Sequence, residues 1–231
     1  MRYSPPHCPA NRCAPSYIAV VHGRRGLEVP SRSGRERPPE RHNDRMTAPI
    51  LGTLSLTPIA DDLLAPPVAA ALLEWPGRVG QPVHQLYTAE IDPALADTAA
   101  FCEHYDVPMA ASANCVIVSG KRDGQLRWAA AVVLATTRVD VNGVLRQHLN
   151  LRKISFAAMV AAVTATGMEY GGITPIGLPG DWPILIDRAV TVAGPVVLGS
   201  GRRASKIVVD GAALAALPRA SVLDGLGLPR G

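Results

Sequence analysis

The residues best suited to chemistry lie in a stretch rich in glycine and proline, GMEYGGITPIGLPGDWPILID, at positions 167–187. Adjacent glycines let the backbone approach a ligand closely and turn its N–H groups toward it. Such groups can stabilise the negative charge that develops on a carbonyl oxygen during acyl transfer. A purely structural turn between a helix and a strand would need the same residue types, so composition alone leaves both interpretations open. The residues concerned are Gly171, Gly172, Pro175, Gly177, Pro179, Gly180 and Pro183.

The common sequence motifs of catalysis are absent from the chain. It contains no G-x-S-x-G, no P-loop and no H-E-x-x-H. The segment GSGRR at 199–203 has two glycines at the spacing of dinucleotide-binding folds but lacks the third. The histidines are scattered and the four cysteines form no C-x-x-C pair. We therefore expect surface histidines and ordinary reduced thiols, with no metal and no cofactor.

Several separated segments together resemble the YbaK family, which includes free-standing editing proteins and the editing insert of bacterial prolyl-tRNA synthetases. The glycine stretch is similar to the family's G-x-x-V-G-G-V-S-P-F-G, which places its GxxxP motif on Gly171 to Pro175. PILIDRAV is similar to PVLIDESL and places the family's aspartate on Asp187. LRQHLNLRKISFAAMVAAVTATG, with Lys153 on a family lysine, and VVLGSGRRASKIVV resemble two further segments. The resemblance covers residues 86–223 in consistent order.

One position departs from the family pattern. Family members carry V-P-x-x-x-x-A-K-T-L-V-V at the start of the first long strand, and the resemblance implies that this lysine lies near the terminal adenosine of tRNA. The present chain reads VPMAASANCVIV, so Asn114 stands at the lysine position. An amide donates and accepts hydrogen bonds but supplies no positive charge.

The resemblance implies hydrolysis of the ester that joins a small mischarged amino acid to the 3′ ribose of tRNA. It implies no nucleophilic side chain, because the site positions a water, the ribose hydroxyl assists and backbone N–H groups hold the carbonyl oxygen. Gly171 and Gly172 are then expected at the oxyanion, Pro175 in shaping the loop, and Asn114 in a hydrogen bond to the terminal nucleotide or the substrate amine. Contacts to phosphate or to other parts of the substrate are expected from Lys153, Thr174, Asp187, Gly199, Gly201, Arg202, Arg203 and Lys206.

Two other functions stay open. One is a non-catalytic module that binds an aminoacyl-nucleotide or an amino acid, and the other is a hydrolase of a different aminoacyl ester, for which Asn114 would suit another leaving group. The expected partners are the acceptor end of tRNA, bound weakly and in a salt-sensitive way, and an aminoacyl-tRNA synthetase. The sequence does not indicate an oligomeric state.

The net positive charge comes from the N-terminus. Residues 1–45 hold nine arginines against four carboxylates, whereas residues 46–231 hold 14 basic and 15 acidic side chains. Being rich in Pro, Arg, Ser and Gly, residues 1–45 are predicted to be disordered. They are either an over-extension of the gene upstream of Met46 or a basic arm that helps to hold RNA. No signal-peptide pattern and no run of 18 uncharged apolar residues occurs, which predicts a cytoplasmic protein without a membrane span.

A helical extension over residues 46–85 is expected to precede an editing domain over residues 86–223. In the extension, TPIADDLLAPPVAAALLEW predicts one or two short helices that begin near Thr57 and break at Pro66–Pro67, and PGRVGQP predicts a loop. In the domain, VHQLYTAEI predicts a strand, and DPALADTAAFCEHYD predicts one helix capped by its first aspartate.

The later segments predict more strands than helices. ANCVIVSGKRDGQLRWAAAVVLATTR predicts a hairpin that turns at Asp123–Gly124. DVNGVLRQHLN predicts a short helix, and KISFAAMVAAVTATG a strand and then a helix ending at Gly167. PILIDRAV, GPVVLGSG and SKIVVD predict strands, and GAALAALP a last helical turn. Strands and helices mix without strict alternation, so we expect a single α+β domain with packed helices and a mixed, partly barrel-like sheet.

Overall fold

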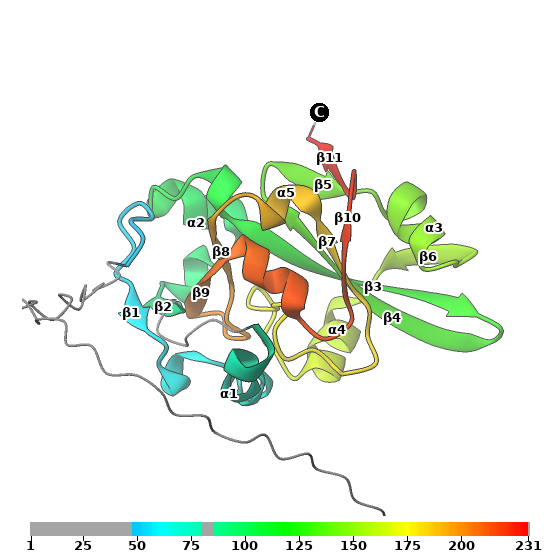
Figure 1. Ribbon diagram of the computed structural model, residues 1–231, viewed down its shortest axis with the longest axis horizontal. Coiled ribbons are helices and arrows are strands. Elements are labelled where there is room, and N and C mark those ends of the chain that lie inside the picture. Colours follow the sequence, from blue (N-terminus) through cyan, green and yellow to red (C-terminus); the bar gives the residue numbers. More distant parts are fainter. Residues whose placement is uncertain (1–47, 80–85, 231) are drawn as a thin grey trace, which may run out of the picture. The chain divides into compact units, whose positions relative to one another are not determined.

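The computed structural model describes residues 48–79 and 86–230, which all belong to one compact unit spanning residues 45–231. The predictions for residues 1–45 therefore lie outside the described residues. Strands and helices follow one another irregularly along this unit (Figure 1). In the described part of the chain, no helix is long and apolar enough to cross a membrane.

The strands form two main sheets and a small ribbon. In chain order they are β1 (Thr57–Pro58), β2 (Tyr87–Glu90), β3 (Ala113–Arg122), β4 (Gln125–Leu134), β5 (Thr137–Val139), β6 (Lys153–Phe156), β7 (Ile184–Asp187), β8 (Pro195–Gly199), β9 (Ser205–Asp210), β10 (Ala220–Leu223) and β11 (Gly227–Pro229). One sheet has the order β1-β2-β9-β8, the second has the order β10-β7-β4-β3-β6, and β5 pairs with β11. The predicted α+β class with a mixed sheet is confirmed, because β7 runs parallel to both of its neighbours while the other pairs are antiparallel. Within the described residues the sheets do not close into a barrel.

Short helices connect the strands. They are η1 (Asp61–Leu63), α1 (Pro66–Val79), η3 (Pro93–Leu95), α2 (Thr98–His104), η4 (Met109–Ala111), η5 (Val141–Leu145), α3 (Arg146–His148), α4 (Met159–Thr166), α5 (Arg188–Thr191) and η6 (Gly211–Ala216). Four of these helices begin in the same way, because an aspartate just before the helix accepts a hydrogen bond from the amide two residues later. These capping residues are Asp92, Asp97, Asp187 and Asp210.

The hairpin of β3 and β4 is the longest element of the fold and was predicted correctly. Its strands pair without interruption from Ala113 opposite Leu134 to Arg122 opposite Gln125. The two turn residues, Asp123 and Gly124, have φ angles of 51° and 77°, as a tight two-residue hairpin turn requires. The predicted strand and helix that end at Gly167 also occur, as β6 and α4.

Residues of β3 face two different cores in alternation. Cys115 and Ile117 point to a core between the two main sheets, which we call the central core. Val116 and Val118 point to the opposite face, where the ribbon and η5 cover the sheet. The side-chain period of two in a strand therefore fixes which β3 residues share a side of the sheet with the glycine-rich loop.

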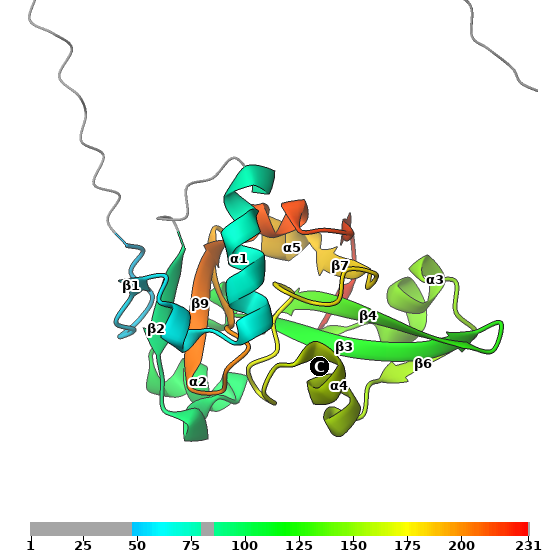
Figure 2. The ribbon, with the colours of Figure 1, turned by 90° about the horizontal axis from the view of Figure 1, so that it is seen from below.

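The two longer helices of the N-terminal half cover the first sheet from opposite sides. Helix α1 packs Val68 and Leu72 into the central core and runs alongside β9 (Figure 2). Helix α2 packs Phe101 against the other face of β9, where Val208 points. The N-terminal extension is thus part of the same compact unit as the strands that follow it.

Two local predictions were wrong. The segment 92–106 forms η3 and α2 instead of one helix, because Asp97 bonds to the amide of Ala99 and so starts a second helix. In the extension, Thr57 belongs to strand β1, so no helix begins there as predicted. Pro66 and Pro67 form the first turn of α1, where a proline needs no amide partner, and α1 continues as far as Val79, into the segment predicted to be a loop.

The two main sheets meet at a single bridge and then separate. Ser112, just before β3, pairs with Val197 of β8 in a parallel bridge. Strand β6 pairs with β3 only from Val118 onward. Between these two points one edge of β3 has no neighbouring strand within the described residues, and the candidate site lies along this edge.

Asp187 connects the second sheet to the C-terminal ribbon. It is buried, and one carboxylate oxygen accepts a hydrogen bond of 2.8 Å from the amide of Ala189 at the start of α5. The other oxygen accepts a hydrogen bond of 2.6 Å from the amide of Gly227 at the start of β11. A single carboxylate therefore holds both the helix that follows β7 and the last strand.

We predict that Asp187→Ala lowers the free energy of unfolding by about 2–4 kcal/mol, because two amide groups lose a charged acceptor. Asp210→Ala is the matched control, since this exposed aspartate caps η6 with a single bond to Ala212 and its loss should cost only about 1 kcal/mol. Urea unfolding of both variants measures the difference. Equal losses in the two variants would contradict the connecting role of Asp187.

Candidate active site

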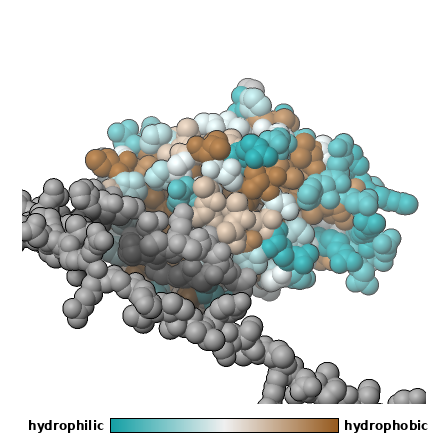
Figure 3. Space-filling view, in the orientation of Figure 1, coloured by the Kyte–Doolittle hydropathy of each residue, from teal (hydrophilic) through white to brown (hydrophobic). Residues whose placement is uncertain are grey.

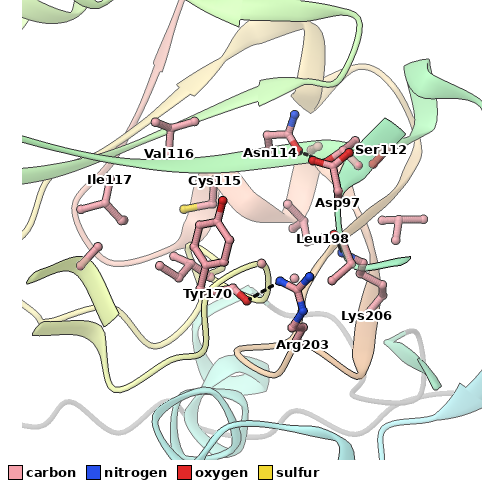
Figure 4. A pocket seen from close by; sticks show the side chains of 18 of the residues that line it. Asp97, Ser112, Asn114, Cys115, Val116, Ile117, Tyr170, Leu198, Arg203 and Lys206 are labelled. Carbon is pink, nitrogen blue, oxygen red and sulfur yellow. Dashed lines mark hydrogen bonds between the residues drawn. The ribbon is translucent and has the colours of Figure 1, made fainter. Parts of the chain in front are cut away.

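A cavity of about 670 Å³ lies where the two main sheets separate (Figure 4). Its walls come from the unpaired edge of β3, the ends of β8 and β9, the start of α2, helix α4 and the glycine-rich loop. The loop faces β3 across the cavity, so segments more than fifty residues apart in the sequence line one space.

The cavity has a polar end and an apolar end. The labelled side chains in Figure 4 show Asp97, Ser112, Asn114, Arg203 and Lys206 gathered at one end. The other end is lined mainly by apolar side chains, namely Ile117, Phe156, Met159, Ala162 and Ile173. A ligand that fits this cavity should therefore combine a charged or polar part with a smaller apolar part.

Asn114 is held in place by α2. Its side-chain oxygen accepts a hydrogen bond of 2.6 Å from the hydroxyl of Thr98. The side-chain NH₂ group has no acceptor among the described residues, so it keeps its donor capacity for a ligand. Thr98 thus decides which end of the amide is already occupied.

Lys206 is a buried cation at the polar end. Its side chain is only 7% exposed, its ammonium donates a hydrogen bond of 3.2 Å to the carbonyl oxygen of Ala96, and it lies 5.0 Å from the centre of the Phe101 ring. Within the described residues no carboxylate lies within ion-pair distance of it. Burial lowers the pKa of Lys206 to about 8, although the Cys102 thiol and Asp97 act in the opposite direction. The side chain therefore remains largely protonated at neutral pH, at an energetic cost that a bound anion would offset.

Arg203 lies beside the glycine-rich loop. Its guanidinium donates a hydrogen bond of 3.3 Å to the carbonyl oxygen of Tyr170 and sits 5.9 Å from the centre of the Tyr170 ring (Figure 4). Its own amide donates a hydrogen bond of 2.7 Å to the carboxylate of Glu169. The loop and the turn between β8 and β9 are therefore linked by both backbone and side-chain contacts.

Glycines allow the loop to pack directly on the turn between β8 and β9. The amide of Gly172 donates to the carbonyl oxygen of Glu169 at 3.0 Å, and the carbonyl oxygen of Gly172 accepts a hydrogen bond from Gly201 at 2.7 Å. A Cβ atom on Gly199 would overlap the carbonyl oxygen of Gly172, and one on Gly172 would overlap the backbone of Arg202. Gly172 and Gly199 are therefore required for backbone packing, whatever else they do.

The amides of Gly171 and Ile173 differ from that of Gly172. Both residues line the cavity, and neither amide has a hydrogen-bond partner among the residues that the structure describes. Gly171 also has a φ angle of 85°, a conformation that glycine adopts without strain. These two amides are the backbone donors available beside the cavity in this loop.

The structure brings some of the predicted site residues together. Asn114, Gly171, Gly199, Arg203 and Lys206 all line the cavity. The sequence patterns that indicated them lie in three separate segments, and the meeting of β3 with β8 unites them.

Other predicted site residues lie elsewhere. Pro175 lines a second hollow of about 410 Å³ beside Trp75. Thr174 is fully buried, and its hydroxyl has no partner among the described residues. Gly172 packs on the backbone of Arg202 and does not line the cavity. Gly201 packs against α1, and the guanidinium of Arg202 donates a hydrogen bond to the carbonyl oxygen of Leu64. Asp187 lies between α5 and β11, and Lys153 lies on β6.

The sequence analysis missed several residues of the cavity. Thr98 was hidden within a predicted helix, although a threonine directly after a capping aspartate marks a helix start that could have been tested. Tyr170 directly precedes the glycine pair, and an aromatic residue there was a usable signal. Ser112 and Arg230 gave no local signal, since long-range pairing alone brings them to the cavity.

Neither a nucleophilic cysteine nor a metal cluster is found in this site. Desolvation raises the pKa of the Cys115 thiol well above its usual range, so the thiol stays protonated and is a poor nucleophile. Among the residues described, no group of three or more His, Cys, Asp or Glu side chains comes together to hold a metal ion. The hydrogen-bond donors that line the cavity are amides, an ammonium and a guanidinium, which bind and polarise a substrate without forming a covalent bond to it.

We predict that Lys206→Met raises the free energy of unfolding at pH 7 by about 1–3 kcal/mol, because it removes a buried cation and keeps the alkyl chain. The folded pKa lies below that of the unfolded chain, so the native protein loses the Lys206 proton first as pH rises. Native stability therefore recovers between about pH 8 and the ordinary lysine pKa of 10.5, and the advantage of the variant should shrink over that window.

Denaturant unfolding at pH 7 and pH 10 measures this difference. Arg127→Met is the control, because it removes an exposed cation from β4. A Lys206→Met variant that is less stable than the parent at pH 7 would show that the ammonium stabilises the free protein.

Comparisons with known proteins agree with this architecture. The family model of the aminoacyl-tRNA editing domain matches residues 92–217, which include α2, β3, the glycine-rich loop, β8 and β9. No curated protein matches the chain.

Several solved structures share the fold. A proposed trans-editing enzyme for prolyl-tRNA synthetase aligns with a TM-score of 0.55 and 17% identity, over 70% of this chain and 98% of that one. A hypothetical protein aligns with a TM-score of 0.57 and 19% identity, over 68% and 99%. A scaffold protein from the computational grafting of epitope backbones aligns with a TM-score of 0.57 and 18% identity, over 73% and 100%.

Identities this low show a shared fold alone, but the family model spans more than half of the chain and contains nearly every segment that lines the cavity. The chain belongs to the aminoacyl-tRNA editing domain family.

Proposed function

We propose that this protein is a trans-acting aminoacyl-tRNA deacylase, which hydrolyses the ester between a small mischarged amino acid and the 3′ ribose of tRNA. The cavity between the sheets is the observation that carries the proposal. It places a buried cation, unpartnered amide donors and an apolar end in one space, within the family-matched part of the chain.

The two ends of the cavity suit the two parts of such a substrate. In this proposal the polar end receives the terminal nucleotide, with Lys206 and Arg203 close to its phosphate. The apolar end, lined by Ile117 and Ala162, receives the side chain of the amino acid. This apolar lining offers few polar partners, so it favours an apolar side chain over a larger polar one.

The chemical step needs a water rather than a protein nucleophile. The water adds to the ester carbonyl, the bond from the carbonyl carbon to the ribose oxygen breaks, and the ribose hydroxyl recovers a proton. We assign the developing oxyanion to the amides of Gly171 and Ile173, which line the cavity and have no partner among the described residues, because the amide of Gly172 is already occupied. We assign the NH₂ group of Asn114 to the substrate, because Thr98 fixes its oxygen.

Lys206 can supply the positive charge that the resembling family takes from a lysine at the position of Asn114. Where the resembling family supplies a lysine from the first long strand, this chain has an amide on β3 and a buried ammonium on β9. We propose that the positive charge has moved from one wall of the cavity to another. The substrate preference then need not match that of proteins with the usual lysine. The expected setting is the cytoplasm, where charged tRNA is used, and a synthetase is the expected partner.

We predict that the full chain releases amino acid from at least one of Ala-, Cys- and Ser-charged mismatched tRNAs, in a time-resolved deacylation assay. Asn114→Ala should lower kcat/KM about 10-fold, the loss expected for one hydrogen bond to the substrate. Gln125→Ala, at the exposed start of β4, is the control and should leave kcat/KM unchanged.

The Asn114→Lys variant tests whether a positive charge on β3 serves the reaction better than the charge of Lys206 on β9 alone. A higher turnover in that variant would show that the departure at position 114 limits the reaction. No turnover of any mischarged tRNA by the parent chain, with binding intact, would reject the deacylase and identify a non-catalytic binding module. An Asn114→Ala variant with full activity would remove the role assigned to that side chain.

A further inference from the structure

The charges of residues 46–231 are unevenly distributed along the sequence. Residues 121–153 hold seven basic and two acidic side chains, whereas the rest of residues 46–231 holds seven basic and thirteen acidic ones. This segment runs from the end of β3 through β4, β5, η5 and α3 to the first residue of β6, and the hairpin tip, α3 and β6 lie together at one end of the molecule (Figure 1). The same end of the molecule is markedly hydrophilic in the space-filling view (Figure 3). The near-neutral total charge therefore conceals a positive end.

A hollow of about 800 Å³ lies at this end, and we call it the basic hollow. Four cations line it, Lys121, Arg146, Arg152 and Lys153, and no carboxylate does. None of the four has an ion-pair partner among the residues described. The hollow also has no aromatic lining residue, unlike the centres of most protein–protein interfaces.

One pair of these cations is placed against its mutual repulsion. Lys121 on β3 stands directly opposite Lys153 on β6 in the antiparallel register. Like charges in such a pair destabilise the sheet. Arg146 is also held in place, because its Nε donates a hydrogen bond of 2.8 Å to the carbonyl oxygen of Asn142. This arrangement is unfavourable for the isolated protein and favourable for a bound polyanion.

We propose that the basic hollow binds the sugar-phosphate backbone of the tRNA acceptor stem. The inference rests on the deacylase function proposed above, and it adds a second contact region to the cavity. Lys121 lies seven residues beyond Asn114 on the same strand, a distance of about 23 Å at the usual rise of a strand.

That distance selects a part of the tRNA. Stacked nucleotides advance by about 3.4 Å each, so the hollow lies about seven nucleotides from the reacting end. This point is beyond the unpaired 3′ end and within the first base pairs of the acceptor stem. Proteins contact an RNA duplex mainly through phosphates and ribose hydroxyls, which cations without aromatic neighbours can bind. The stem would then be bound by its charge and shape rather than by its sequence.

The first test measures binding of uncharged tRNA to the full chain by fluorescence anisotropy between 50 and 200 mM salt. We expect Lys153→Glu to weaken binding at least 10-fold and to reduce the slope of log K against log salt by about one. Arg138→Glu is the matched control, because it makes the same charge change at an exposed arginine on β5, outside the basic hollow, and should change binding less than 2-fold.

The second test separates the basic hollow from the cavity. Lys153→Glu should raise KM for a full-length mischarged tRNA at least 10-fold and leave kcat/KM unchanged for an aminoacylated trinucleotide, which is too short to reach the hollow. Because the substitution removes the repulsion from Lys121, Tm should not fall. A variant that loses activity on both substrates equally would overturn the proposal.

Unchanged tRNA binding by Lys153→Glu would also overturn it, and loss of synthetase binding in that variant would assign the hollow to a protein instead. The two proposals can fail separately. If the parent chain hydrolyses neither substrate, the deacylase function is rejected, while the anisotropy data on uncharged tRNA still decide whether the basic hollow binds RNA.

Discussion

The site depends on where strand β3 lacks a second neighbour. One edge of β3 pairs with β4 along its whole length, but the other edge meets β8 only at the Ser112–Val197 bridge and β6 only from Val118 onward. The amide of Ala157 donates to the oxygen of Ile117 at this second edge. Because backbone groups of a strand point to alternate edges, the N–H and C=O of Cys115 point the same way, into the cavity. A fully paired β3 would leave no space for a substrate.

Because side chains alternate along β3, neighbouring residues of this strand point to opposite faces of the sheet. Cys115 and Ile117 belong to the side of the central core and the glycine-rich loop, while Val116 and Val118 pack on the other face of the sheet. Asn114 belongs to that other face by the same alternation, and it lines the cavity where the unpaired edge of β3 borders it. The β3–β4 hairpin extends from the cavity to the positive end of the molecule, and its side chains alternate between the two faces along this length. One rigid element thus connects the proposed reaction site and the proposed stem contact, so their spacing is fixed by a strand and not by a loop.

Elements with local signals could be predicted from the sequence. The Asp123–Gly124 pair indicated the hairpin because both turn residues need a positive φ angle, which few residue types adopt. Gly167 indicated the end of α4 for the same reason. The glycine-rich loop was singled out by its residue types and spacing, and Asn114 was found through the family resemblance. Sequence patterns could not show that Asp97 starts a second helix, that Thr98 occupies the oxygen of Asn114, or that Lys206 is buried without a carboxylate. Those facts depend on pairing between distant segments, on which local propensity has no information.

The backbone contact between Gly172 and the turn at Gly199–Gly201 has a consequence for how this protein can diversify. Loop and turn touch without intervening side chains, so the two segments behave as one rigid wall that cannot be reshaped by substitution without steric overlap. The opposite wall, formed by β3 and α4, carries ordinary side chains such as Ile117 and Met159. Substitutions that change the amino-acid preference of related chains should therefore accumulate on the wall formed by β3 and α4. The wall formed by the glycine-rich loop and the turn should stay the same.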